Sequence, residues 1–125
     1  MMELTVYFKS VLEQDLAPIV LCSVDHTVVY MNPAAAKRYE ARGGYGLVGQ
    51  SLLNCHNPQT AEILGKILAW FSESPEHNLV YESRNEKENK DVYIVALRDE
   101  SGALIGYCEK HEYRSLETGK PYDFG

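Results

Sequence analysis

The pair Cys55-His56 is the part of the sequence whose residue types could most readily do chemistry. It stands directly before Asn57-Pro58, which is typical of a helix start because Asn can cap the first N–H groups and Pro suits the first helical position. The N–H groups and dipole at a helix N-terminus favour a thiolate or a bound anion. A cysteine can equally be buried for packing alone, with the histidine bonded to a loop carbonyl. The sequence therefore leaves a ligand role and a structural role open for this pair.

The remaining candidates for chemistry do not form a recognisable motif. The chain has 3 cysteines, an odd number, and no CxxC pair, which indicates a reducing compartment and no disulfide framework. No Ser/His/Asp arrangement, paired carboxylates, buried acid or phosphate-binding glycine loop can be placed with confidence. We therefore expect no catalysis. The other histidines lack the spacing of metal ligands and are expected at surface or turn positions: His26, His77 and His111.

Composition and charge narrow the class of protein. The chain has 125 residues, the size of one domain, and a formal net charge of -6. An acidic surface without any Lys/Arg block repels phosphate backbones, so we expect no nucleic-acid partner. The N-terminus lacks the basic and apolar regions of a signal peptide, and the longest apolar run, residues 17–22, is too short for a membrane helix. These features predict a soluble, cytoplasmic protein without a membrane partner.

Hydrophobic periodicity predicts an element order of helix, two strands, helices and three strands. Apolar residues at helical spacing predict a first helix at residues 4–15, with a stripe formed by Leu4, Phe8, Val11 and Leu12. Further helices begin at the two Asn-Pro pairs. The expected strands lie at 18–24, 27–31, 77–83, 91–98 and 103–113. We expect one domain over residues 1–113, its N-terminal helix within 1–16, and a C-terminal tail at 114–125.

This order favours an α+β fold with an antiparallel sheet, because neither group of strands needs a parallel crossover. Residues 92–97 are apolar on both alternating faces, whereas a sheet with one face in water alternates apolar and polar residues. Both faces of the sheet should therefore be covered. The middle helices would cover one face, and the N-terminal helix or a second subunit the other.

The same features resemble the PAS domain superfamily. The resemblance rests on a strand-turn-strand unit, the helix start after it, a Gly-containing phrase before the long helix, and a closing hairpin. The corresponding segments are residues 19–25, 28–32, 33–35, 47–53 and 95–106. It implies a five-stranded antiparallel sheet with helices on one face, an N-terminal helix, and a ligand cavity between sheet and helices.

A narrower resemblance is to bacterial PAS modules found with hemerythrin-like domains, which have a Cys-His-Pro phrase before the long helix. Here Cys55-His56-Asn57-Pro58 has an inserted Asn, and the strand end is Gly106-Tyr107-Cys108-Glu109. Haem-binding PAS domains use a histidine of the long helix as axial ligand, so His56 would be the metal ligand if haem is bound. A flavin is disfavoured, because the phosphate-pairing Arg, an Asn pair and a Gln of light-oxygen-voltage domains are all replaced.

By analogy with the family, the face of the last strand that carries Gly106 and Cys108 should point into the cavity. In PAS sheets the first and last strands are neighbours, so the resemblance implies that Cys22 and Cys108 lie near each other; small core residues on adjacent strands are favoured over a redox pair. The resulting function is a sensory domain that binds a small ligand and relays its state by contact with an unidentified partner protein, as a homodimer. The alternative is a ligand-free dimerisation module; a small isomerase-type enzyme is the weakest hypothesis. The expected cavity residues are Cys22, Leu52, Cys55, His56, Leu64, Leu68, Tyr81, Val95 and Cys108.

Overall fold

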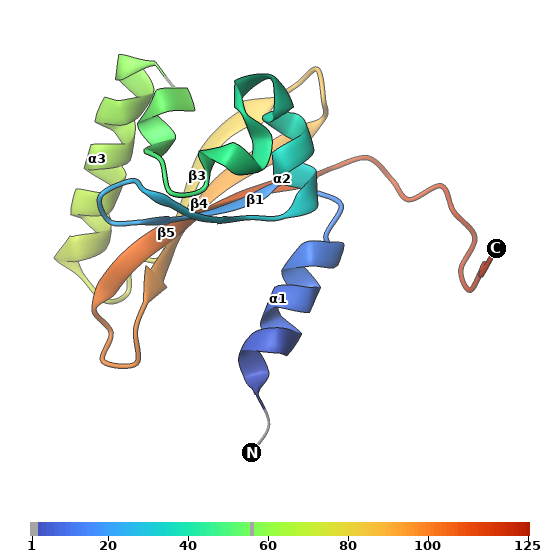
Figure 1. Ribbon diagram of the computed structural model, residues 1–125, viewed down its shortest axis with the longest axis horizontal. Helices are drawn as coiled ribbons and strands as arrows, with labels where there is room; N and C mark the ends of the chain where they lie inside the picture. The colour runs from blue at the N-terminus through green and yellow to red at the C-terminus, as the bar shows by residue number, and fades with distance from the viewer. Residues whose placement is uncertain (1–2, 56) are drawn as a thin grey trace.

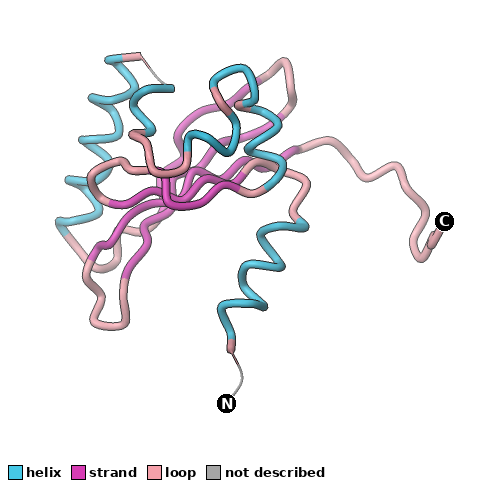
Figure 2. The backbone as a smooth tube through the Cα atoms, viewed as in Figure 1, coloured by secondary structure: helices cyan, strands magenta, loops and turns pink. Residues whose placement is uncertain are grey.

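The computed structural model describes residues 3–55 and 57–125. Its elements follow the expected order (Figure 1). They are α1 (Leu4–Gln14), β1 (Ile19–Ser23), β2 (Val28–Met31), α2 (Pro33–Arg38), short 3-10 helices at Glu40–Arg42, Gly44–Leu47 and Leu52–Cys55, α3 (Pro58–Glu73), β3 (Leu79–Asn85), β4 (Lys90–Arg98) and β5 (Leu104–Tyr113). Residues 114–125 form neither helix nor strand and extend away from the sheet (Figure 2).

The strands form one five-stranded antiparallel sheet in the order β2-β1-β5-β4-β3. The last strand, β5, therefore lies at the centre, between β1 and β4. Helices α2 and α3 and the short 3-10 helices lie on one side of the sheet, and α1 projects away from it (Figure 1). The expected α+β fold is confirmed.

Both predicted Asn-Pro helix starts are confirmed. The side-chain oxygen of Asn32 accepts a hydrogen bond from the backbone N–H of Ala35, and that of Asn57 accepts one from Thr60, each at 2.9 Å. Helix α2 is short, with 6 residues. It ends at Arg38, and the chain then turns through Gly43 with φ of 120°, a conformation that favours glycine.

The register of β5 decides which side chains face the helices. Directly opposed residues of antiparallel strands point to the same side of a sheet. Ile94 of β4 faces the helices within the core and pairs with Glu109, and the core residue Tyr107 pairs with Cys22. The face that carries Tyr107, Glu109 and His111 is therefore the helix side. The prediction that the Gly106/Cys108 face points toward the helices was wrong.

The core fills the space between this side of the sheet and the helices. Helix α3 contributes Leu64, Ile67 and Phe71, while Ile63, expected on the same stripe, is exposed. The strands contribute buried apolar side chains from both halves of the chain, and the short helices add small or aliphatic ones. These core residues are Val20, Cys22, Val28, Met31, Ala35, Ala36, Leu47, Leu52, Ile94 and Tyr107.

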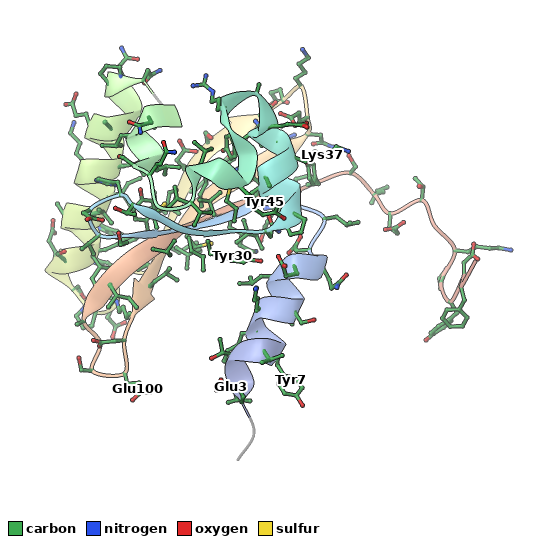
Figure 3. The ribbon with its side chains drawn as sticks, in the orientation of Figure 1. Glu3, Tyr7, Tyr30, Lys37, Tyr45 and Glu100 are labelled. Carbon is green, nitrogen blue, oxygen red and sulfur yellow. The ribbon has the colours of Figure 1, made fainter. Side chains whose placement is uncertain are left out.

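The other side of the sheet, called the outer face below, exposes apolar side chains along its β3 edge, whereas Cys108 near its centre is only 8% exposed. Leu79 is 57% exposed and Tyr81 is 55% exposed, and both pair with apolar or aromatic residues of β4. Helix α1 does not cover this face, because none of its side chains is buried. Figure 3 shows Tyr7 projecting from α1 away from the sheet. Of the two covers predicted for this face, the N-terminal helix does not lie over it, and a second subunit stays a prediction.

Candidate functional site

A buried polar group lies on the helix side of the sheet, where the core is otherwise apolar. The hydroxyl of Tyr39, at the end of α2, donates a 2.7 Å hydrogen bond to Oε1 of Glu109. Nε2 of His111 lies 2.9 Å from the same oxygen. Glu109 and His111 are only 7% and 4% exposed. We call these three residues the Glu109 cluster; it joins α2 to the central strand.

The histidine of this cluster has one unsatisfied nitrogen. Because a carboxylate accepts hydrogen bonds, the contact with Glu109 assigns the proton of His111 to Nε2. Nδ1 of His111 is buried without a hydrogen-bond partner among the described residues. A buried polar atom without a partner costs free energy, and such atoms often bind a water or a ligand. The atom therefore offers a place for a hydrogen-bonding partner.

Burial and charge act on the two neighbouring titratable side chains. Burial raises the pKa of Tyr39, and the charge of Glu109 raises it further, so the phenol stays a donor. Lys90, at the start of β4, is 1% exposed, and its ammonium lies 3.5 Å from Glu88. Burial lowers the pKa of Lys90, and the positive charge of Arg38 lowers it further. Arg38 also binds both oxygens of Glu88, so Lys90 and Arg38 share this one carboxylate as their anionic partner.

Replacing Lys90 by methionine is expected to stabilise the protein. A buried charge that is incompletely paired costs more than an apolar side chain of similar length, so we expect a gain of about 1 kcal/mol at pH 7. Because folding lowers the pKa of Lys90, the Lys90 ammonium keeps its proton to a higher pH in the unfolded chain than in the folded protein. Wild-type stability should therefore rise as the pH approaches the ordinary lysine value, and the variant should lack this rise. Urea unfolding at pH 7 and pH 9.5 measures both effects; a less stable Lys90→Met protein at pH 7 would contradict the prediction.

Four of the residues expected to line a cavity lie on the helix side. Cys22, Leu52 and Leu64 are buried in the core, and Leu68 packs against it. They come from β1, a 3-10 helix and α3 and surround the apolar part of this side. The Glu109 cluster lies on the same side of the sheet.

Three others lie on the outer face. Val95 of β4 pairs with Cys108 of β5 and with Leu79 of β3, and Tyr81 pairs with Tyr93. Cys22 and Cys108 lie on neighbouring strands and are both buried, as expected, but on opposite faces of the sheet, which argues against the redox pair that the sequence left open. Burial raises the pKa of Cys108 to about 12, so its sulfur is a thiol at neutral pH.

The pair Cys55-His56 stays a sequence-based prediction. The backbone of Cys55 ends a 3-10 helix, but its side chain and all of His56 lie outside the described residues. Within residues 3–55 and 57–125, no three His, Cys, Asp or Glu side chains come together as metal ligands. In the same parts of the chain, each helix is too short or too polar to cross a membrane.

The sequence did not reveal the Glu109 cluster. We expected no buried acid, yet the carboxyl side chain of Glu109 is buried. The sequence grouped Tyr107, Glu109 and His111 on one face of the last strand, but placed this face away from the helices. One signal for the buried face was available in the sequence. This face carries the large aromatic ring of Tyr107, whereas the other face carries a glycine and a lysine. Pairing with Tyr39 depends on the tertiary fold.

Comparison with known proteins shows the fold. No family model matches the chain, and neither does any curated protein. A PAS domain from Colwellia psychrerythraea is similar with a TM-score of 0.66 and 11% identity, covering 89% of this chain and 97% of that one.

Two further solved structures are similar over most of their length. A C-terminal domain from Streptococcus mutans has a TM-score of 0.64 and 21% identity, covering 87% of this chain and 84% of that one. A sensory box sensor histidine kinase from Vibrio cholerae has a TM-score of 0.58 and 18% identity, with 87% and 90% covered. Together with the strand order and the position of the helices, these similarities show that the chain has the fold of a PAS domain.

Proposed function

We propose that this protein is a sensory domain that binds a small ligand between the helices and the sheet and passes its state on by protein contact. The observation that carries the proposal is the Glu109 cluster. A carboxylate, an imidazole and a phenol meet there in a buried position, and Nδ1 of His111 accepts no hydrogen bond from any described residue. Binding sites are mostly apolar with a few convergent polar groups, as on this side of the sheet.

The chemistry of the cluster indicates what such a ligand carries. Oε1 of Glu109 already accepts from the hydroxyl of Tyr39 and lies 2.9 Å from Nε2 of His111, so the ligand meets the cluster at Nδ1 of His111 with a group that hydrogen-bonds to an imidazole nitrogen. Its apolar part lies against side chains such as Leu64 and Leu68. Haem, held by His56, is a second candidate ligand that rests on the sequence resemblance alone.

Native mass spectrometry and an absorption spectrum of the protein as isolated test the ligand proposal. We expect a bound small molecule in the wild type that is lost in His111→Phe, which keeps an aromatic ring but removes Nδ1. The matched control is His77→Phe, because His77 stacks on Trp70 outside the cluster. A Soret band that is lost in His56→Ala would assign the ligand as haem. Ligand-free protein whose melting temperature ignores haem, flavins and small metabolites would favour the alternative, a ligand-free dimerisation module.

We further propose a second copy of this chain as the partner, bound through the outer face and α1. The same molecule exposes both surfaces that such a dimer needs. Helix α1 exposes an apolar stripe in which Phe8 is 63% and Val11 is 70% exposed, and the outer face exposes Leu79 and Tyr81. Burying exposed apolar area is the main favourable term in protein association.

Light scattering after size-exclusion chromatography tests the dimer. We expect a mass near twice 14.1 kDa, and a shift toward the monomer in Leu79→Glu on the outer face. Ile63→Glu is the matched control, because Ile63 on α3 is exposed to a similar degree, 50% against 57%, on the other side of the sheet. A monomeric wild type, or equal effects of the two substitutions, would refute the dimer and leave the ligand proposal standing.

A further inference from the structure

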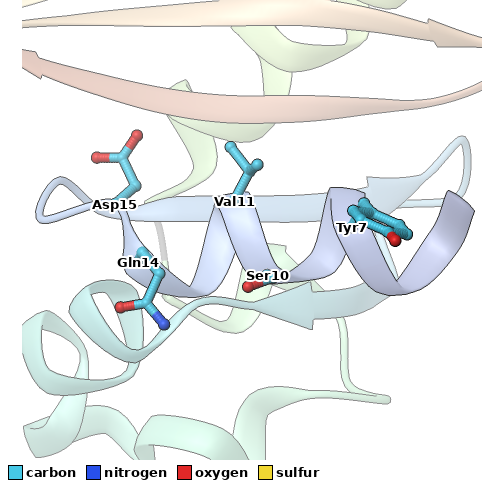
Figure 4. A pocket seen from close by; sticks show the side chains of 5 residues that line it. All are labelled: Tyr7, Ser10, Val11, Gln14 and Asp15. Atoms are coloured by element: carbon cyan, nitrogen blue, oxygen red, sulfur yellow. The ribbon is translucent and has the colours of Figure 1, made fainter.

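Packing against the rest of the domain contributes little to helix α1. It has 11 residues, and none of its side chains is buried. Isolated helices shorter than about 12–15 residues are marginal in water. An open groove runs beside α1, and residues of α1 and the residue that follows it line this groove without any residue of the sheet. Figure 4 shows the lining side chains, which are Tyr7, Ser10, Val11, Gln14 and Asp15. The order of α1 therefore depends on how its C-terminal end is held.

Asn32 holds that end. Its side chain is fully buried, at 0% exposure, and uses both of its polar atoms. Nδ2 donates to three backbone carbonyls at the end of α1 and in the linker to β1, and Oδ1 accepts from two backbone N–H groups. The acceptors are Leu12 at 3.0 Å, Ala17 at 2.9 Å and Asp15 at 3.4 Å; the donors are Ile19 and Ala35, each at 2.9 Å.

The same residue begins α2, so one side chain joins three elements. Oδ1 of Asn32 caps α2, and Nδ2 binds the end of α1. At its other end, α2 is followed by Tyr39, whose hydroxyl binds Glu109. Helix α2 is thus tied at one end to the buried cluster and at the other, through Asn32, to the exposed helix. A second tie, from the hydroxyl of Tyr30 to Glu13 at 2.7 Å, holds α1 without passing through α2.

We infer that Asn32 is a positioning residue that couples α2 to α1, so that a shift of α2 orders or releases α1. An element that is marginally stable alone responds strongly to the loss of one cap, which makes α1 suited to an order-disorder switch. The coupling acts on the folded domain whether or not a ligand binds, so it goes beyond the proposed ligand site. Its output is the exposed apolar stripe of α1.

Asn32→Asp tests the coupling directly. The substitution keeps Oδ1 and thus the cap of α2, but replaces the donor Nδ2 by an oxygen that repels the carbonyls of Leu12 and Ala17. Hydrogen exchange followed by mass spectrometry should show that the protection of the backbone amides of residues 8–14 falls by about tenfold. The amides of β4 and β5, which report global opening, should keep their protection.

The chain offers a matched control for this substitution. Asn57 occupies the equivalent position at the start of α3, and none of its described hydrogen bonds reaches α1 or its linker. Asn57→Asp should leave the exchange of α1 unchanged. If it accelerates α1 as much as Asn32→Asp does, the inference is overturned, as it is if Asn32→Asp leaves α1 protected.

A double substitution tests whether the coupling runs through α2. Tyr39→Phe removes the hydroxyl that ties α2 to Glu109. Introduced alone, it should speed the hydrogen exchange of α1; introduced into the Asn32→Asp protein, it should cause no additional increase. Equal effects in both backgrounds would mean that Asn32 does not transmit the change. If Asn32→Asp exposes β4 and β5 as well, Asn32→Ser, whose hydroxyl can still cap α2, repeats the measurement. Protection of α1 that survives in the serine variant overturns the inference.

Discussion

Substituting Gly106 by alanine is expected to destabilise the protein by at least about 3 kcal/mol, because overpacking against backbone cannot be relieved by a rotamer change. Gly106 lies on β5 opposite Ser23 of β1. A Cβ at this position would overlap the carbonyl oxygen of Cys22 and lie 3.0 Å from its carbon and 3.1 Å from Cα of Ser23. The first strand would have to move away from the last. Urea unfolding measures the loss.

Gly65→Ala is the control for this prediction. Gly65 lies in the middle of α3, and apart from its chain neighbours and the helix's own backbone no described atom lies within 4 Å of the Cβ that alanine would add. Alanine is the better helix former, so we expect a gain of about 0.5–1 kcal/mol. A loss of stability in Gly106→Ala together with a gain in Gly65→Ala would show that the close approach of β1 and β5 excludes a side chain at position 106. A Gly106→Ala protein as stable as the wild type would refute this prediction.

The second large effect is expected for Glu109→Ala. The truncation leaves the hydroxyl of Tyr39 and Nε2 of His111 buried without their shared acceptor. Two unsatisfied donors and a small cavity should together cost about 3 kcal/mol. Glu109→Gln retains a carbonyl acceptor and should lose less. Thermal and urea unfolding of both variants give the comparison.

Glu112→Ala is the matched control on the same strand. The carboxylate of Glu112 pairs with Lys110 and Arg114 at the partly exposed surface. Surface ion pairs contribute little, so the loss should stay below about 1 kcal/mol. If Glu109→Ala costs no more than Glu112→Ala, the cluster does not hold α2 to the sheet.

The order of elements and the PAS fold could be predicted because both rest on local signals. Apolar periodicity marked the strands and the long helix, and the two Asn-Pro pairs marked helix starts that the structure confirms at Asn32 and Asn57. The turn at 99–102 was also visible, since Gly102 adopts a φ of 89° there. Each of these features depends on residues that are neighbours in the chain.

The faces of β5 and the polar cluster could not be predicted in this way. Each face of this strand carries both polar and apolar residues, so alternation alone does not say which one is buried. The answer depends on pairing with β1 and β4. Glu109 is buried because Tyr39, 70 positions earlier, supplies a donor, and a single sequence does not show that contact. The role of Cys55-His56 stays a prediction.

The central place of β5 also determines when the protein can fold. Strand β1 pairs on one side with β2 and on the other with β5, which follows every other strand of this sheet in sequence. Contacts between segments so distant in sequence are slow to form, because a long loop must close first. Until the ribosome releases residues 104–113, β1 and β4 each keep an unpaired edge that can associate with other chains. We therefore expect the sheet to form only after residues 104–113 emerge, with the nascent chain dependent on chaperones until then.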